Sequence, residues 1–280
     1  MLSSDLQAQW DREGFIVVKD FADAATRERM LDTIVDMVRR ADAGEDIAPA
    51  YVVPESVLEK EGERPEDRVS KVFRVHREVP VFRDFVCQPR LVDLVGGVLG
   101  PDVDCFLSQF IFKLPGALGQ PWHQDAFYFP FDREPQVGAW LALTETTPEN
   151  GPLWVLPRSH TEPLHQAVRD TREHANMAYV EIVDHDTRAA VPVLLDPGDL
   201  IVFHSHLFHK SSDNTADYMR AAMVYHFGEG GTVDHSEEKW GVRPPNVDWM
   251  PIRRGGSPVE APLCHDAGAP ASAPKDRGMT

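Results

Sequence analysis

The chain has 280 residues, of which 42% are hydrophobic and 26% charged, and its net charge is −17 at neutral pH. This composition is typical of a globular protein long enough to bury a sizeable core. The 45 acidic residues outnumber the 28 basic ones, which argues against nucleic acid or an anionic membrane as the main partner, since both need a basic surface. A small molecule fits this charge balance better.

The cysteines and the N-terminal segment bear on the compartment. The three cysteines, Cys87, Cys105 and Cys264, are scattered and form no CxxC pair, which favours a reducing compartment. The N-terminus has no apolar signal core, and no apolar run approaches the roughly 18 residues of a membrane span. We therefore expect a cytoplasmic protein without a membrane partner, either a monomer or a homodimer.

The first part of the chain, residues 1–100, is expected to be largely helical. Met30, Ile34 and Val38 recur at helical spacing, which predicts an amphipathic helix. A polar, acidic stretch at about 42–70 reads as a long loop or lid. The helices that the pattern predicts lie at residues 6–13, 23–41, 80–86 and 91–99, with a strand at 15–18.

The pattern changes at Val103, where short β-prone segments separated by turn residues begin. Many short strands with little helix between them predict an antiparallel sandwich or barrel, a mostly β fold with flanking helices. A helical insert is expected at 168–177. The expected strands lie at residues 105–114, 126–129, 137–143, 153–156, 178–182, 191–195, 200–204 and 221–227.

We expect one domain over residues 1–255. It would comprise the helical part up to residue 100, a jelly-roll core at 103–228 and a C-terminal extension at 229–255. Residues 256–280 are of low complexity and are expected to be disordered.

The motif Trp122-His123-Gln124-Asp125 places an imidazole and a carboxylate two residues apart. On a strand, such residues share one face and can point into the same cavity. A hydrogen-bonded His–Asp pair without a metal explains most random occurrences of this spacing. The metal interpretation therefore depends on a third ligand elsewhere in the chain.

A candidate third ligand lies in the cluster His204-Ser205-His206-Leu207-Phe208-His209, which follows the turn Pro197-Gly198-Asp199. Two histidines and one carboxylate can bind Fe(II) on one face and leave positions open for substrate and oxygen. Spacing does not decide which histidine takes part. Simple alternation places His204 and His206 on one face and His209 on the other, unless the chain bends between them.

Arg220 lies beyond the turn that follows the histidine cluster. The segment from His209 to Arg220 reads as a hairpin, which would bring Arg220 back toward the metal. A guanidinium binds a carboxylate through two parallel, charge-assisted hydrogen bonds, which suits an acidic cosubstrate.

Three blocks in this order, HQDAFYFPF, NGPLWVLPRSH and HKSSDNTADYMR, resemble the phytanoyl-CoA dioxygenase (PhyH) family of Fe(II)/2-oxoglutarate oxygenases, over about residues 10–228. The resemblance implies a cupin-like double-stranded β-helix. It also implies an enzyme that uses Fe(II), 2-oxoglutarate and O2 to hydroxylate, or otherwise oxidise, a C–H bond of a small-molecule metabolite, releasing succinate and CO2. Related halogenases have Gly or Ala in place of Asp125, so hydroxylation is favoured over halogenation.

The resemblance implies site residues one by one. His123, Asp125 and His209 would be the iron ligands. The residues that it implies around 2-oxoglutarate are Arg220, which binds the distal carboxylate, Ser211, which assists, and Lys71, Trp140 and Gln109, which line the pocket.

The family pattern also gives expectations for residues outside the ligand set. His204 is expected to be a supporting or core residue, and His206 to be structural or to face the substrate. Arg158 stands where the family has a turn glycine, so the geometry of this turn is open, and its side chain could project toward the mouth of the site.

Two other classes of function stay open from the sequence. A non-redox cupin-type enzyme that uses Zn(II) would have no need of Arg220 and Ser211. A non-catalytic member could bind 2-oxoglutarate or another ligand as a sensor. The substrate is not encoded in the motifs.

Overall fold

The computed structural model describes residues 2–57 and 64–259. The helices in these ranges are α1 (Ser4–Glu13), α2 (Ala24–Asp42), α3 (Pro80–Val86), α4 (Pro89–Leu99) and α5 (Ser236–Trp240), with 3-10 turns η1 (Pro65–Arg68), η2 (Asp125–Phe127) and η3 (Ser159–Thr161). The strands are β1 (Phe15–Val18), β2 (Tyr51–Pro54), β3 (Val69–Phe73), β4 (Val103–Lys113), β5 (Val137–Ala142), β6 (Leu153–Val155), β7 (Val168–Arg169), β8 (Val180–Glu181), β9 (Val191–Val193), β10 (Leu200–His204), β11 (His209–Ser211), β12 (Arg220–Glu229), β13 (Met250–Arg254) and β14 (Ser257–Pro258).

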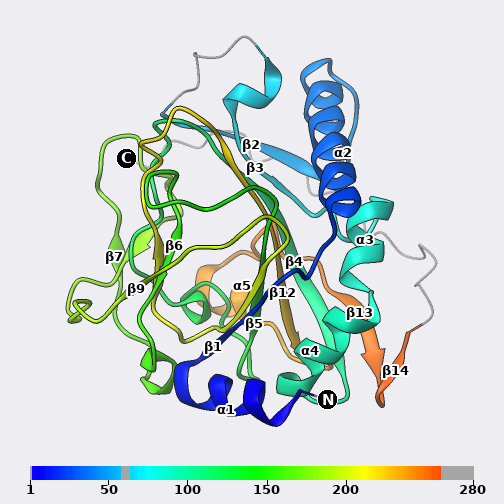
Figure 1. Ribbon diagram of the computed structural model, residues 1–280, viewed down its shortest axis with the longest axis vertical. Helices are drawn as coiled ribbons and strands as arrows, with labels where there is room; N and C mark the ends of the chain where they lie inside the picture. The colour runs from blue at the N-terminus through cyan, green and yellow to red at the C-terminus, as the bar shows by residue number, and fades with distance from the viewer. Residues whose placement is uncertain (1, 58–63, 260–280) are drawn as a thin grey trace.

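The strands form a large sheet and a small one that face each other. The large sheet runs in the order β1-β10-β5-β12-β4-β13-β14, with β3 also paired to β4 and β2 to β3, while the small sheet runs β11-β6-β9. Figure 1 shows α2, α3 and α4 along one side of the large sheet and β6 and β9 on the other. The pairs in both sheets are antiparallel, and the predicted mostly β, jelly-roll fold is confirmed.

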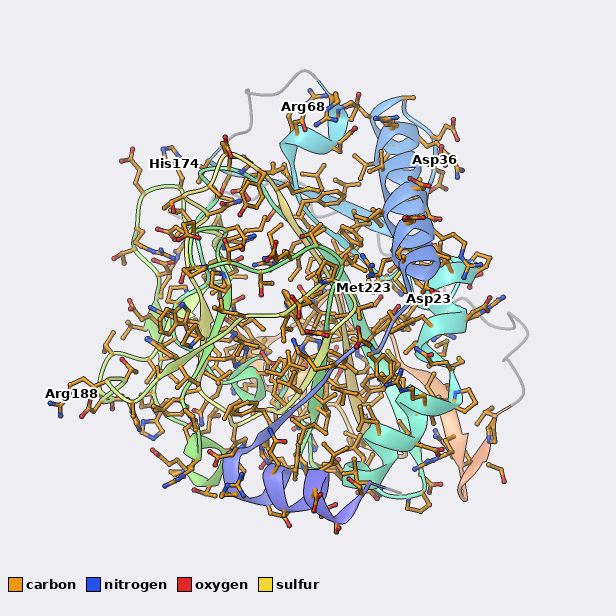
Figure 2. All side chains as sticks on the ribbon, in the orientation of Figure 1. Asp23, Asp36, Arg68, His174, Arg188 and Met223 are labelled. Carbon is orange, nitrogen blue, oxygen red and sulfur yellow. The ribbon has the colours of Figure 1, made fainter. Side chains whose placement is uncertain are left out.

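Because side chains alternate along β12, this strand packs against the helices on one face and against the small sheet on the other. Met223 and Tyr225 face the helices, where the Tyr225 hydroxyl donates to the carbonyl of Phe82 in α3 (3.0 Å). Ala222 and Val224 point the other way and pack between the two sheets. Figure 2 shows Met223 deep within the molecule, and its side chain is 0% exposed. Because successive strand residues alternate in direction, the even-numbered residues of β12 face the space between the sheets.

Two expected elements differ from the structure. Residues 126–129 are not a strand, because the Tyr128 amide bonds back to the Asp125 carbonyl (2.9 Å) and closes η2. Residues 168–177 are not helical: they begin with β7, which pairs with β8, and continue in bends and turns. The Arg172 amide donates to a carboxylate oxygen of Asp170 (3.0 Å), a local bond that competes with helix formation.

The connections also differ from expectation. The segment from His209 to Arg220 is not a hairpin, because β11 lies in the small sheet and β12 in the large one. The stretch 42–70 contains β2 and η1, and its residues 58–63 lie outside the described part. In the C-terminal extension, β13 adds a strand to the large sheet beside β4.

The expected division into one domain and a disordered tail stays a prediction. β14 lies at the start of the expected tail, and residues 260–280, with Cys264, lie outside the described part. Across the described ranges, none of the helices has the length and apolarity needed to cross a membrane. The cytoplasmic location and the oligomeric state stay predictions.

Candidate active site

His123 and His209 are brought together by a short antiparallel bridge between the loop that carries His123 and the start of β11. Each donates its backbone N–H to the carbonyl of the other (3.0 and 3.1 Å), and their rings lie 4.1 Å apart between centroids. Asp125 begins η2, and its Oδ1 lies 3.6 Å from Nε2 of His123 and 3.5 Å from Nε2 of His209. His123 and Asp125 are therefore close in space as predicted, although a 3-10 turn and not a strand presents the carboxylate.

The outer nitrogen of each imidazole is held by a backbone carbonyl. Nδ1 of His123 lies 2.7 Å from the Pro121 carbonyl, and Nδ1 of His209 lies 2.9 Å from the Leu207 carbonyl. Because a carbonyl only accepts, Nδ1 carries the proton and Nε2 presents a lone pair toward Asp125. This tautomer, fixed by a backbone acceptor, is the one found in metal-binding histidines.

A third histidine, His226 on β12, contacts the other oxygen of Asp125. Its Nε2 lies 3.1 Å from Oδ2, and its side chain is buried. This bond holds the carboxylate so that Oδ1 faces the two metal-binding nitrogens. The sequence analysis missed His226, although it lies on the same face of β12 as Arg220 by simple alternation.

The protonation states of the site suit a divalent cation. Burial, with the neighbouring His123, lowers the pKa of His209 to about 4. Burial by itself would raise the pKa of Asp125, but the adjacent histidines outweigh it and hold that pKa well below its usual value. At neutral pH the site therefore offers neutral imidazole and ionised carboxylate, the forms that bind Fe(II).

Arg220 opens β12 and lies in the same pocket as the triad. Its side chain is 2% exposed and stacks on the ring of Trp140, 5.2 Å from the centroid. One nitrogen donates to the Gly151 carbonyl (2.7 Å), whereas Nε and Nη1 have no partner in the part of the chain that the structure describes. Burial lowers the pKa of Arg220 to about 10, so it stays a cation at neutral pH and needs an anion beside it.

Lys113, at the end of β4, adds a second buried basic side chain to the pocket that Arg220 lines. Its Nζ donates to the Leu118 carbonyl (2.8 Å) and to the Ser211 hydroxyl (3.3 Å). Burial, and next the charge of Arg220, lower the pKa of Lys113 well below its usual value. The sequence analysis missed Lys113, which alternation places on the same face of β4 as Gln109.

The pocket brings together all eight residues that the resemblance implies for the iron and 2-oxoglutarate sites. Lys71 on β3 lines the pocket, and its ammonium lies 5.1 Å from the Tyr179 ring centroid. Besides the triad and this lysine, the predicted residues that line the pocket are Gln109, Trp140, Ser211 and Arg220.

The remaining predicted residues lie elsewhere. His204 packs against Trp10 of α1 (5.9 Å between rings) and does not line the pocket. Nδ1 of His206 lies 3.1 Å from the Glu162 carbonyl, so His206 supports a loop. Arg158 keeps the left-handed conformation of the turn (φ 74°) without a glycine, and its side chain lies near Glu13 of α1, not at the mouth of the pocket.

Comparison with known proteins decides the family. Residues 10–222 match the family model described as phytanoyl-CoA dioxygenase (PhyH). The chain belongs to the phytanoyl-CoA dioxygenase family. The predicted family and the predicted class of enzyme, a dioxygenase, are thereby confirmed.

Relatives of this family with assigned names cover most of the chain. "Phytanoyl-CoA dioxygenase 1" of Oryza sativa subsp. japonica is 26% identical over 82% of this chain and 90% of its own length. "Ectoine dioxygenase" of Sphingopyxis alaskensis is 28% identical over 91% of this chain and 84% of its own length.

A solved structure, that of EctD from S. alaskensis with 2-oxoglutarate and 5-hydroxyectoine, has a TM-score of 0.63 and 23% identity, and covers 81% of this chain and 76% of that one. EctD is also solved with bound iron. Iron and 2-oxoglutarate are the cofactors predicted for the present protein, and the ligand set that iron needs is in place in the described residues.

Proposed function

We propose that this phytanoyl-CoA dioxygenase family member is an Fe(II)/2-oxoglutarate-dependent hydroxylase of a small-molecule metabolite. The observation that carries the proposal is the pairing, in one pocket, of the convergent triad with a buried arginine that has two unpartnered nitrogens. His123, Asp125 and His209 would hold the iron. Iron bound there would supply the oxidising power for the C–H bond together with O2 and 2-oxoglutarate.

The chain's own residues would position 2-oxoglutarate. Arg220 has N–H groups at Nε and Nη1 free to donate to the distal carboxylate through charge-assisted hydrogen bonds. Lys113 and the Ser211 hydroxyl lie beside it in the pocket lining. Trp140 and Phe203 close the wall with apolar surface, which excludes water and strengthens these charged contacts.

The lining residues away from the triad and Arg220 would select the substrate. Glu55 and Lys71 line the pocket from the region of β2 and β3, and Tyr179 from the segment before β8. Side chains of both charges suit a small polar metabolite. The net charge of −17 disfavours a substrate as rich in phosphate as a coenzyme A thioester.

Succinate release with Fe(II), O2 and 2-oxoglutarate over a panel of amino acids, amines and acyl thioesters tests this function. We expect one class of compound to stimulate succinate release and to yield a hydroxylated product by mass spectrometry. Asp125→Ala, which removes a ligand, should abolish the coupled release. Asp36→Ala, on the exposed face of α2, should match the parent.

The alternatives predict different results. A zinc-dependent cupin enzyme would show no absorption band from iron-bound 2-oxoglutarate under anaerobic conditions. A sensor would bind 2-oxoglutarate with Fe(II) but release no succinate with any compound. Either result, with Asp125→Ala indistinguishable from the parent, would overturn the proposal.

A further inference from the structure

A second group of metal-binding side chains lies apart from the pocket. Glu162 follows η3, His165 lies three residues on, and His185 comes from the loop after β8. Oε2 of Glu162 lies 3.2 Å from Nε2 of His165 and 3.0 Å from Nε2 of His185. All three side chains are partly buried, and none of them lines the pocket of the triad.

The outer nitrogens of both rings face acceptors. Nδ1 of His185 lies 3.1 Å from the Asp186 carbonyl, and Nδ1 of His165 lies 3.6 Å from a carboxylate oxygen of Asp184. The iron triad also directs two Nε2 atoms at one carboxylate, and there a backbone carbonyl holds each Nδ1, as the Asp186 carbonyl holds that of His185. An outer acceptor of this kind orients a histidine for a metal and raises its basicity.

The carbonyl of Asp186 fixes the tautomer of His185. Nδ1 carries the proton in that bond, so in the neutral form of the ring Nε2 presents its lone pair to the Glu162 carboxylate. In that form two acceptors face each other at 3.0 Å and repel, and either a proton or a metal cation between them removes the repulsion. A divalent metal ion provides that cation without requiring either imidazole to be protonated.

We propose that Glu162, His165 and His185 form a second divalent-metal site that takes Zn²⁺. Two imidazoles and one carboxylate with a solvent position complete a four-coordinate zinc site. Imidazole ligands also favour Zn²⁺ over Fe(II) in the usual affinity order of divalent ions. The site is separate from the iron triad, so it goes beyond the proposed oxygenase activity.

The site would join two parts of the segment between β6 and β9, which packs against residues next to the iron ligands. Both imidazoles pack edge-on against Phe208, at 4.9 and 4.5 Å between ring centroids, and Phe208 directly precedes the ligand His209. In the same segment, the Ile182 amide donates to the Trp122 carbonyl (2.8 Å), beside His123. Bound zinc would therefore stabilise the part of the chain that places Tyr179 in the pocket wall.

Zinc titration of the full chain after removal of the iron site tests the proposal. In metal-free His123→Ala/His209→Ala protein, Zn²⁺ in competition with a chromophoric chelator should still bind at about one equivalent. Adding His165→Ala or His185→Ala should weaken that binding by at least about tenfold. His174→Asn is the matched control, because His174 lies in the same segment on the outer surface (Figure 2) and has a left-handed backbone that Asn tolerates.

A second measurement in the parent chain guards against misfolding of the iron-site variant. Zn²⁺ should slow tryptic cleavage at Arg169 and Arg172, which lie in the segment between β6 and β9, and His185→Ala should remove that protection. Absence of zinc binding once the triad is removed, or binding unchanged by both His165→Ala and His185→Ala, would overturn the proposal. The three side chains would then be a protonated imidazole–carboxylate cluster.

Discussion

Arg220 is 2% exposed, yet two of its guanidinium nitrogens have no partner in the described part of the chain. A buried cation without an anion is costly, and the basic side chain of Lys113 lines the same pocket. Such a pocket is stable where a ligand carboxylate completes it. The unfavourable burial of these two basic side chains therefore supports an anionic cosubstrate in the pocket.

Changing Arg220 tests the assignment of that pocket. Arg220→Lys keeps a charge but loses the fork, and we expect the affinity for 2-oxoglutarate to fall about 10- to 100-fold, in line with charged hydrogen bonds of about 1.5–3 kcal/mol. Anaerobic titration of the Fe(II)-loaded protein with 2-oxoglutarate measures this affinity. Arg12→Lys, on the exposed surface of α1, should have no effect, and an unchanged affinity in Arg220→Lys would contradict the assignment.

His226 gives a second prediction for a single residue. It donates Nε2–H to Oδ2 of Asp125 (3.1 Å) and so orients a metal ligand without binding the metal. We expect His226→Ala to lower Fe(II) affinity about tenfold, as loss of such a partner does in other metal sites. His226→Gln, whose amide can donate to the same oxygen, should restore part of it. Equal Fe(II) affinities in His226→Ala and the parent would show that other contacts orient Asp125.

At the level of elements, alternation along β4 and β12 explains what the sequence predicted well. The β-prone segments at 105–114 and 221–227 predicted these strands, and the residues of β12 that line the pocket include Arg220 and His226. Pattern alone failed at residues 126–129, where aromatic side chains favour a strand but the Asp125 carbonyl closes a 3-10 turn. It failed again at 168–177, because local bonds from Asp170 compete with a helix.

Close approach of two segments gives a prediction at this scale. Gly119 lies against β11, and a Cβ added to it would lie 2.0 Å from the Ser211 carbonyl oxygen. Gly119→Ala must push β11 away, so we expect weaker 2-oxoglutarate binding as well as a lower free energy of unfolding. Gly116→Ala strains a left-handed residue of the same segment but meets open space, so it should lower stability and leave 2-oxoglutarate affinity unchanged. Equal 2-oxoglutarate affinity in both variants would refute this packing argument.

For the whole molecule, the sequence motifs predicted the triad and Arg220. They could not show which other strands and loops form the pocket around these residues. Alternation places Lys113 and His226 on the same strand faces as Gln109 and Arg220. Only the folded structure shows that both side chains line the pocket. Likewise, β13 joins the large sheet from beyond the expected core. The set of residues that lines the pocket depends on such long-range contacts between loops and sheets, which short motifs do not encode.

His76 links three distant parts of the chain and is fully buried. Its Nδ1 lies 2.8 Å from the Ser108 hydroxyl of β4, and its Nε2 lies 2.9 Å from the Asp248 carbonyl in the C-terminal extension. The Ser108 oxygen already accepts two backbone N–H groups, so its own proton goes to Nδ1 and Nε2–H donates to Asp248. The ring is therefore held neutral, and burial lowers the pKa of His76 to about 4.

This lowered pKa predicts how the stability of the whole fold depends on pH. Between the ordinary value of 6.5 and about 4, the unfolded chain binds a proton at His76 that the folded chain does not. The free energy of unfolding should therefore fall as the pH drops through this window, by up to about 3 kcal/mol from this residue. Urea unfolding at pH 7.5, 6 and 5 measures this change in the free energy of unfolding. His76→Gln should be less stable at pH 7.5 but should lose less stability on acidification, while His174→Asn should keep the parental slope; identical slopes in His76→Gln and the parent would mean that His76 is not held neutral in the fold.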